Sequence, residues 1–225
     1  MKKCLYSLAT LTLLSSAHAQ FFGGWADGVT SMPTSKTASL TRLAYDDFTF
    51  DLAGSINGFG IVGRNNTGSP VAIYWEIRTG MSAGNGGTLL FSGTSPGATI
   101  SPLAENSIFG TPPSGPGQFA LYEGAPLVPF SVPAGTYWLG LAPLEVFGSF
   151  DVTSTQGAGS IGHPINNGNA FYYDSSNPSA NYISMGANDF GFKITTSAPT
   201  SVVPEPGTLA LLGLAALSLL RLRRK

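Results

Sequence analysis

The sequence predicts an all-β body, an antiparallel β-sandwich or jelly roll, because three features of the chain agree. Short segments in which apolar and polar residues alternate recur along the chain, and period two is typical of half-buried strands. Turn signals separate these segments, and Gly makes up 29 of the 225 residues, well above its usual share of about 7%. Residues 20–203 contain no segment with a helical period, and many short strands separated by turns are typical of sandwiches and jelly rolls.

Two segments carry the strongest strand patterns. Residues 47–52 alternate, which places Phe48, Phe50 and Leu52 on one face and the polar residues on the other. Residues 71–78 form the strongest strand of the chain, because their odd-numbered positions are all apolar and share one inner face. Residues 136–141 form a second clear strand, and residues 189–194 alternate again. Further strands are expected at 56–63, 88–91, 118–122 and 127–132, and weaker ones at 146–153 and 169–173.

The two ends of the body resemble each other in sequence. Asp47-Phe48-Thr49-Phe50 is echoed by Asp189-Phe190-Gly191-Phe192. We interpret these segments as the first and last strands of the body, paired antiparallel with matching apolar faces. Such a pair would close the sandwich and bring the termini of the body together.

The N-terminus has the pattern of a secretory signal peptide. Lys2 and Lys3 form a basic start, residues 5–14 are apolar, and Ala17-His18-Ala19 is a small-residue cleavage site. We therefore expect a signal peptide at 1–19, a leader at 20–39 and the β-sandwich body at 40–200. The single cysteine, Cys4, lies inside the signal, so the body has no disulfide and no cysteine-ligated metal.

The charge of the body is hidden by the two ends of the chain. Residues 20–203 hold five basic and eleven acidic residues, a net charge of −6, although the whole chain has −1. Nucleic-acid recognition depends on Lys and Arg that meet phosphates. An acidic body therefore argues against nucleic acid as a partner.

The last 24 residues, 202–225, differ from the body. Pro204-Glu205-Pro206 breaks any preceding helix, because proline lacks a backbone donor. The 13 residues 208–220 carry no charge and are rich in Leu and Ala, which would give a helix of about 20 Å. Four basic residues follow, and they would let this short span reach both headgroup layers and keep the C-terminus in the cytoplasm. They are Arg221, Arg223, Arg224 and Lys225.

This tail resembles the PEP-CTERM sorting signal of Gram-negative bacteria, which is also catalogued as the ice-binding protein C-terminal domain. The resemblance implies that an exosortase, a membrane cysteine transpeptidase, recognises Pro204, Glu205 and Pro206 and removes the tail. It implies a transmembrane helix at about 207–222, transient residence in the inner membrane, and delivery to the cell surface or the extracellular polysaccharide. The body lacks regular Thr arrays, so it does not support ice binding.

Catalysis has little support in the sequence. His163 is the one histidine outside the expected signal, and it lies in a Gly/Pro turn without a nearby nucleophile and orienting acid. Glycoside hydrolysis would need two carboxylates about 5–10 Å apart. The glutamates of the body are scattered, at Glu76, Glu105, Glu123 and Glu145. We expect no enzyme activity and no cofactor.

Two binding functions remain as alternatives. A structural Ca²⁺ site would use the oxygen ligands of Asp47, Asp51 and Asp189, although the same aspartates also suit a solvated strand face. A carbohydrate-binding face would use aromatic rings for stacking on exopolysaccharide. Its candidates are Tyr74, Trp138, Tyr172, Tyr173 and Tyr182.

The sequence thus predicts an exported, non-catalytic surface or matrix protein with a structural or adhesive role. The alternative is a carbohydrate-binding module for exopolysaccharide.

Overall fold

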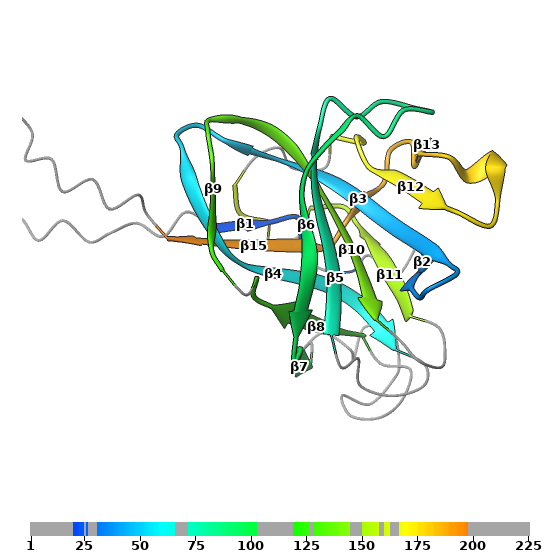
Figure 1. Ribbon diagram of the computed structural model, residues 1–225, viewed down its shortest axis with the longest axis horizontal. Helices are drawn as coiled ribbons and strands as arrows, with labels where there is room; N and C mark the ends of the chain where they lie inside the picture. The colour runs from blue at the N-terminus through cyan, green and yellow to red at the C-terminus, as the bar shows by residue number, and fades with distance from the viewer. Residues whose placement is uncertain are drawn as a thin grey trace, which may run out of the picture.

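The fold is described from a computed structural model of the chain. It describes residues 20–24, 26, 31–65, 72–102, 119–126, 128–144, 150–157, 160–162 and 167–197. In these residues the chain forms β-strands and one short 3-10 helix, η2, at Pro178–Ala180 (Figure 1). The prediction of an all-β body is confirmed, and the jelly-roll order of the strands stays a prediction.

The strands of the described residues follow the turn signals of the sequence. Their bounds are β1 Gln20–Phe22, β2 Ser31–Lys36, β3 Thr41–Phe50, β4 Gly54–Asn65, β5 Ala72–Thr79, β6 Thr88–Pro96, β7 Thr99–Pro102, β8 Phe119–Gly124, β9 Phe130–Val132, β10 Gly135–Leu144, β11 Phe150–Thr155, β12 Phe171–Asp174, β13 Ile183–Ser184, β14 Asp189–Phe190 and β15 Phe192–Ser197.

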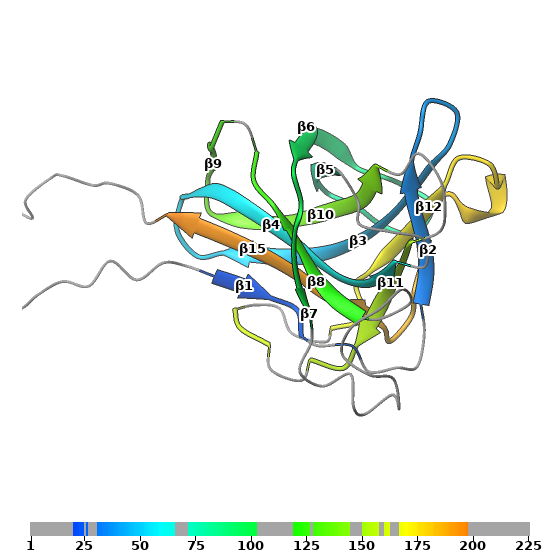
Figure 2. The same cartoon turned by 90° about the horizontal axis from the view of Figure 1, so that it is seen from below.

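The named strand pairs are all antiparallel and belong to one continuous network. One half is built on β4, which pairs with β8, β9, β11 and β15. The other half runs from β12 through β3, β10 and β5 to β6. Strand β2 joins the halves, because its first residues pair with β11 and its last two with β3. Figures 1 and 2 show the two halves layered over each other.

The main core fills the space between the two halves, as in a sandwich. Phe59 of β4 lies with its ring centroid 5.0 Å from that of Trp75 on β5, and Phe21 of β1 lies 6.2 Å from Phe48 of β3. Each fully buried side chain of this size stabilises the fold by about 1.5–3 kcal/mol. The apolar face predicted for β5 is confirmed, since Ile73, Trp75 and Ile77 are buried in this core.

A second cluster covers the outer face of β3, β5 and β10. Its buried members include Tyr45, Trp138 and Phe171, and Tyr182 packs against them from the loop after β12. Strand β3 is consequently buried on both faces over most of its length. Leu52, expected on the core face of this strand, is 77% exposed because β3 ends at Phe50.

The predicted pairing of the two end strands is wrong. The segment that starts at Asp47 belongs to β3 and pairs with β10. Strand β15 pairs instead with β4 and with β1, in which Phe21 lies opposite Ile194. Both Phe-x-Phe segments bury their rings in the main core. Residues expected to form a leader thus supply β1 and β2 to the sheet.

Candidate functional site

The outer face of β5 carries a carboxylate with three hydrogen-bond donors. Glu76 accepts from the hydroxyls of Tyr45 and Tyr74 at 2.9 and 2.8 Å and from Arg78 Nε at 2.7 Å. The Arg78 guanidinium also lies 5.8 and 5.5 Å from the ring centroids of Tyr45 and Tyr182. We call Tyr45, Tyr74, Glu76, Arg78 and Tyr182 the Glu76 cluster.

Strand geometry brings three members of this cluster together. Tyr74, Glu76 and Arg78 alternate with the core residues of β5, so all three point to the outer face. Glu76 is 6% exposed, and a charge buried to this extent requires a partner, which Arg78 provides. In the sequence, Glu76 is only one of several scattered carboxylates. The Tyr-x-Glu-x-Arg alternation was the signal that could have identified the cluster.

Burial and the Glu76 carboxylate keep the tyrosines of the cluster protonated. Burial, followed by the hydrogen bond to Glu76, raises the pKa of Tyr74 to about 12. Burial and the negative charge of Glu76 raise the pKa of Tyr45 well above its ordinary value. Both hydroxyls therefore donate at neutral pH, and the cluster forms a fixed network around Glu76.

Tyr182 connects this network to two loops. Its φ of 51° lies in the left-handed region, where a residue other than Gly is strained. Its ring stacks on Tyr173 with centroids 4.8 Å apart, and its carbonyl accepts from Gly84 N at 3.0 Å. A Cβ on Gly86 would overlap the Tyr182 ring, so the turn after β5 packs directly on this side chain.

The tyrosines and the tryptophan predicted to bind carbohydrate differ in their solvent exposure. Trp138 is 8% exposed, and its Nε1 donates to the Asn169 carbonyl at 3.1 Å. Tyr172 is 5% exposed, and its hydroxyl donates to the Pro33 carbonyl at 2.8 Å. Half-buried rings remain at Tyr74, Tyr173 and Tyr182. These three are the least buried of the described candidates.

The structure brings two of the predicted calcium ligands together. Asp47 Oδ2 accepts from the side-chain amides of Asn167 and Asn169 at 3.2 and 3.4 Å, and Asp189 Oδ1 accepts from Asn169 N at 3.2 Å. Asp51 lies outside this group and is exposed. Over the ranges that the structure describes, no three His, Cys, Asp or Glu side chains are placed to hold a metal ion.

Asp46, which lies beside Asp47 in the sequence, completes this group of carboxylates. Its Oδ1 accepts from Asp47 N at 2.9 Å and its Oδ2 from Phe190 N at 2.8 Å, so it links β3 to β14. We call Asp46, Asp47 and Asp189 the aspartate cluster. Burial is the largest cause that raises the pKa of each, and the Asp189 charge adds to the rise at Asp46 and Asp47.

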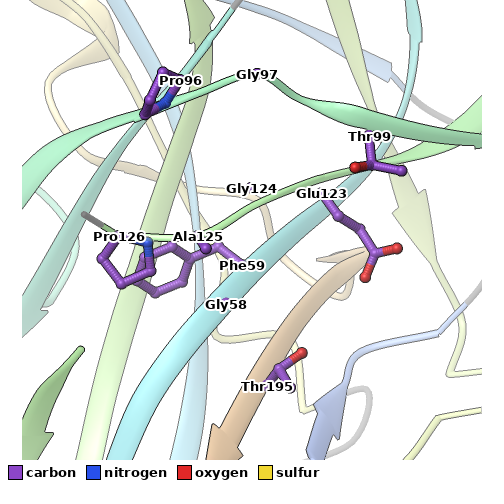
Figure 3. Close-up of a pocket in the computed structure, with 10 residues that line it drawn as sticks. All are labelled: Gly58, Phe59, Pro96, Gly97, Thr99, Glu123, Gly124, Ala125, Pro126 and Thr195. Carbon is purple, nitrogen blue, oxygen red and sulfur yellow. The ribbon is translucent and has the colours of Figure 1, made fainter. Parts of the chain in front are cut away.

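A groove of about 580 Å³ lies between the end of β6 and the strands β4, β8 and β15 (Figure 3). Phe59, Pro96 and Pro126 contribute its apolar surface. Glu123 is the one ionisable residue among those that line it, and its Oε1 lies 2.6 Å from Lys193 Nζ. The groove therefore offers a single, ion-paired carboxylate and no acid–base pair of carboxylates.

The sorting residues predicted in the tail, Pro204, Glu205, Pro206 and the basic residues 221–225, lie outside the described residues, as do His163, the signal peptide and the expected transmembrane helix. Within the part of the chain that the structure covers, no helix has the length and apolar character needed to span a bilayer.

Comparison with known proteins identifies the tail. Residues 202–225 match the PEP-CTERM protein-sorting motif, which confirms the resemblance expected from the sequence. No curated protein matches the chain. The motif implies exosortase-dependent sorting to the cell surface, with export, processing at the membrane, and an exosortase as the processing partner.

Proposed function

We propose that this is an exported, non-catalytic protein that an exosortase releases from the membrane by recognising Pro204, Glu205 and Pro206, and that its β body has a structural or adhesive role on the surface or in the extracellular matrix. The observation that carries the proposal is the PEP-CTERM motif at residues 202–225. The basic residues that end it, Arg221, Arg223, Arg224 and Lys225, would hold the C-terminus in the cytoplasm before cleavage.

The chemistry of the body supports a role without catalysis. The Glu76 carboxylate is occupied by three donors, and the Glu123 carboxylate in the groove is paired with Lys193. A general acid or base must be within reach of substrate and free to exchange a proton. Glu76 instead links β5 to Tyr45 of β3 across the intervening β10. Glu123 of β8 links to Lys193 of β15 across the intervening β4.

Tail mutagenesis in the producing organism tests the sorting. Glu205→Ala should leave the full-length precursor in the membrane fraction, because the recognition motif loses its charged residue. Thr200→Ala, which lies just outside the matched residues, is the control and should be processed like the wild type. Equal processing of Glu205→Ala and the wild type would contradict the proposal.

Carbohydrate binding is the second candidate function. It is supported by the stacked pair Tyr173 and Tyr182, whose ring centroids lie 4.8 Å apart and which remain half-buried on the outer face near Tyr74. Stacking of sugar rings on tyrosine faces uses the combination of apolar ring and polar hydroxyl that such residues present.

Affinity electrophoresis against the exopolysaccharide of the producing organism tests this candidate. The wild type should be retarded, and Tyr173→Ala should reduce the retardation. Leu52→Ala removes an exposed side chain far along the chain from this tyrosine pair and serves as the control. Absence of retardation in the wild type would exclude the candidate. Trp138→Ala is unsuitable here because Trp138 is part of the second core cluster.

A further inference from the structure

Strand β6 is a long strand at one edge of the sheet. It spans nine residues, Thr88–Pro96, and its partner is β5, along Ala72–Thr79. Among the described strands it has no second partner, and Figure 1 shows it beside β5 after β10 in the order of the sheet. The backbone N–H and C=O groups on the outer side of such a strand are a template for another strand.

The other strands of the described body that pair on one side are short. They span two to four residues each, and they are β1, β7, β9, β13 and β14. Short length is one of the ways in which proteins prevent edge-to-edge association. Strand β6 differs from all of them in length.

The chemistry of β6 also favours association. Its nine residues include no charge, and Leu89 and Leu90 are 44% and 40% exposed. Its neighbour β5 contributes Glu76 and Arg78, which neutralise each other at 2.7 Å. The body as a whole has a net charge of −6 over residues 20–203, and an uncharged strand brings no like charges to a contact between two copies.

We propose that β6 is the pairing interface for a second copy of this chain, joined antiparallel about a two-fold axis. A two-fold contact uses the same surface on both partners. Among the described strands, β6 is the one long, uncharged edge strand that could provide this surface. The contact would continue the sheet from β5 through both β6 strands and cover Leu89 and Leu90. It is independent of exosortase sorting, and it would give a surface or matrix protein a means of assembly.

Cysteine cross-linking tests the pairing on the full chain. In a Cys4→Ser background the chain has no cysteine, so single substitutions Leu90→Cys, Ser92→Cys and Thr94→Cys report on β6 alone. Opposed residues of an antiparallel pair lie about 4.5–5.5 Å apart, within disulfide reach. A single variant tests the register in which its cysteine lies opposite the same cysteine of the second copy. An equimolar mixture of Leu90→Cys with Ser92→Cys, or of Ser92→Cys with Thr94→Cys, tests the register in which the two substituted positions lie opposite each other. At least one variant or mixture should oxidise to a dimer, and Val128→Cys should not.

Sedimentation equilibrium gives an independent measurement. The full chain should form a dimer, and Leu90→Lys/Thr94→Lys should weaken it by at least about tenfold. The matched control Leu52→Lys/Val128→Lys replaces two exposed apolar residues away from β6 and should dimerise normally. A monomeric wild type up to about 100 µM, or equal dissociation constants for both double variants, would overturn the proposal. A monomer whose tail is still processed would leave the sorting proposal intact.

Discussion

Removal of the Glu76 carboxylate tests whether the outer-face network stabilises the body. In Glu76→Leu, Arg78 loses an ion pair of 2.7 Å while its side chain is only 14% exposed, and the hydroxyls of Tyr45 and Tyr74 lose their acceptor. Breaking a buried pair by removing one partner destabilises a protein by about 3–5 kcal/mol. Arg78 keeps its bond to the Gly86 carbonyl at 3.0 Å, so we expect the lower end, about 3 kcal/mol.

Urea unfolding at pH 7, followed by tryptophan fluorescence, measures this change in the free energy of unfolding. Glu123→Leu is the matched control, because its ion pair with Lys193 is more exposed, at 30% and 21%, and should contribute less than about 1 kcal/mol. The double variant Glu76→Leu/Arg78→Leu should be less destabilised than the sum of its single variants. A loss below about 1 kcal/mol for Glu76→Leu, or strict additivity, would refute the reasoning.

Three further variants test the core and the aspartate cluster. Burial raises the pKa of Asp47 above its ordinary 3.8, so the stability that Asp47 contributes is full below pH 3.8 and is lost as pH rises through the raised pKa. The free energy of unfolding of Asp47→Asn, measured relative to the wild type, should therefore increase from pH 4 to pH 8. A difference that stays constant with pH would contradict this. Gly63→Ala should lower the melting temperature clearly, since its Cβ would overlap the Phe150 ring, whereas Gly54→Ala, 3.6 Å from the nearest atom, should change it little; equal shifts would argue against this packing. Trp138→Ala should lower the free energy of unfolding, measured in urea, by about 3–5 kcal/mol. A decrease below about 1 kcal/mol would show that the Trp138 side chain is exposed to solvent and not buried.

Local patterns in the sequence predicted the strands well and the partners of the strands poorly. The alternation in β5 identified Ile73, Trp75 and Ile77 as core residues, because period two depends only on neighbours along the chain. The pairing of the chain ends could not be derived in the same way. Both Phe-x-Phe segments have to bury their rings in a core. Their sequences do not show whether the two segments pair as neighbouring strands or only contribute to the same core.

The outer face of the body shows a second limit of sequence patterns. Trp138 lies opposite the main core face, as expected, yet it is buried in the second core cluster, where Phe171 packs against it and the Asn169 carbonyl accepts from its Nε1. Asp47 is buried for a similar reason, since Asn167 and Asn169 reach it from 120 and 122 residues away. Contacts at such separations leave no local signal. The tail could be recognised from sequence because a sorting motif is read as a linear segment.

The mature C-terminus of the protein from its producing organism tests the central claim most directly. Intact-mass spectrometry of the extracellular and surface fractions should find a chain that begins near Gln20 and ends near Val203, just before the Pro-Glu-Pro motif. A chain that keeps residues 204–225 and is recovered from the cytosol would contradict exosortase sorting.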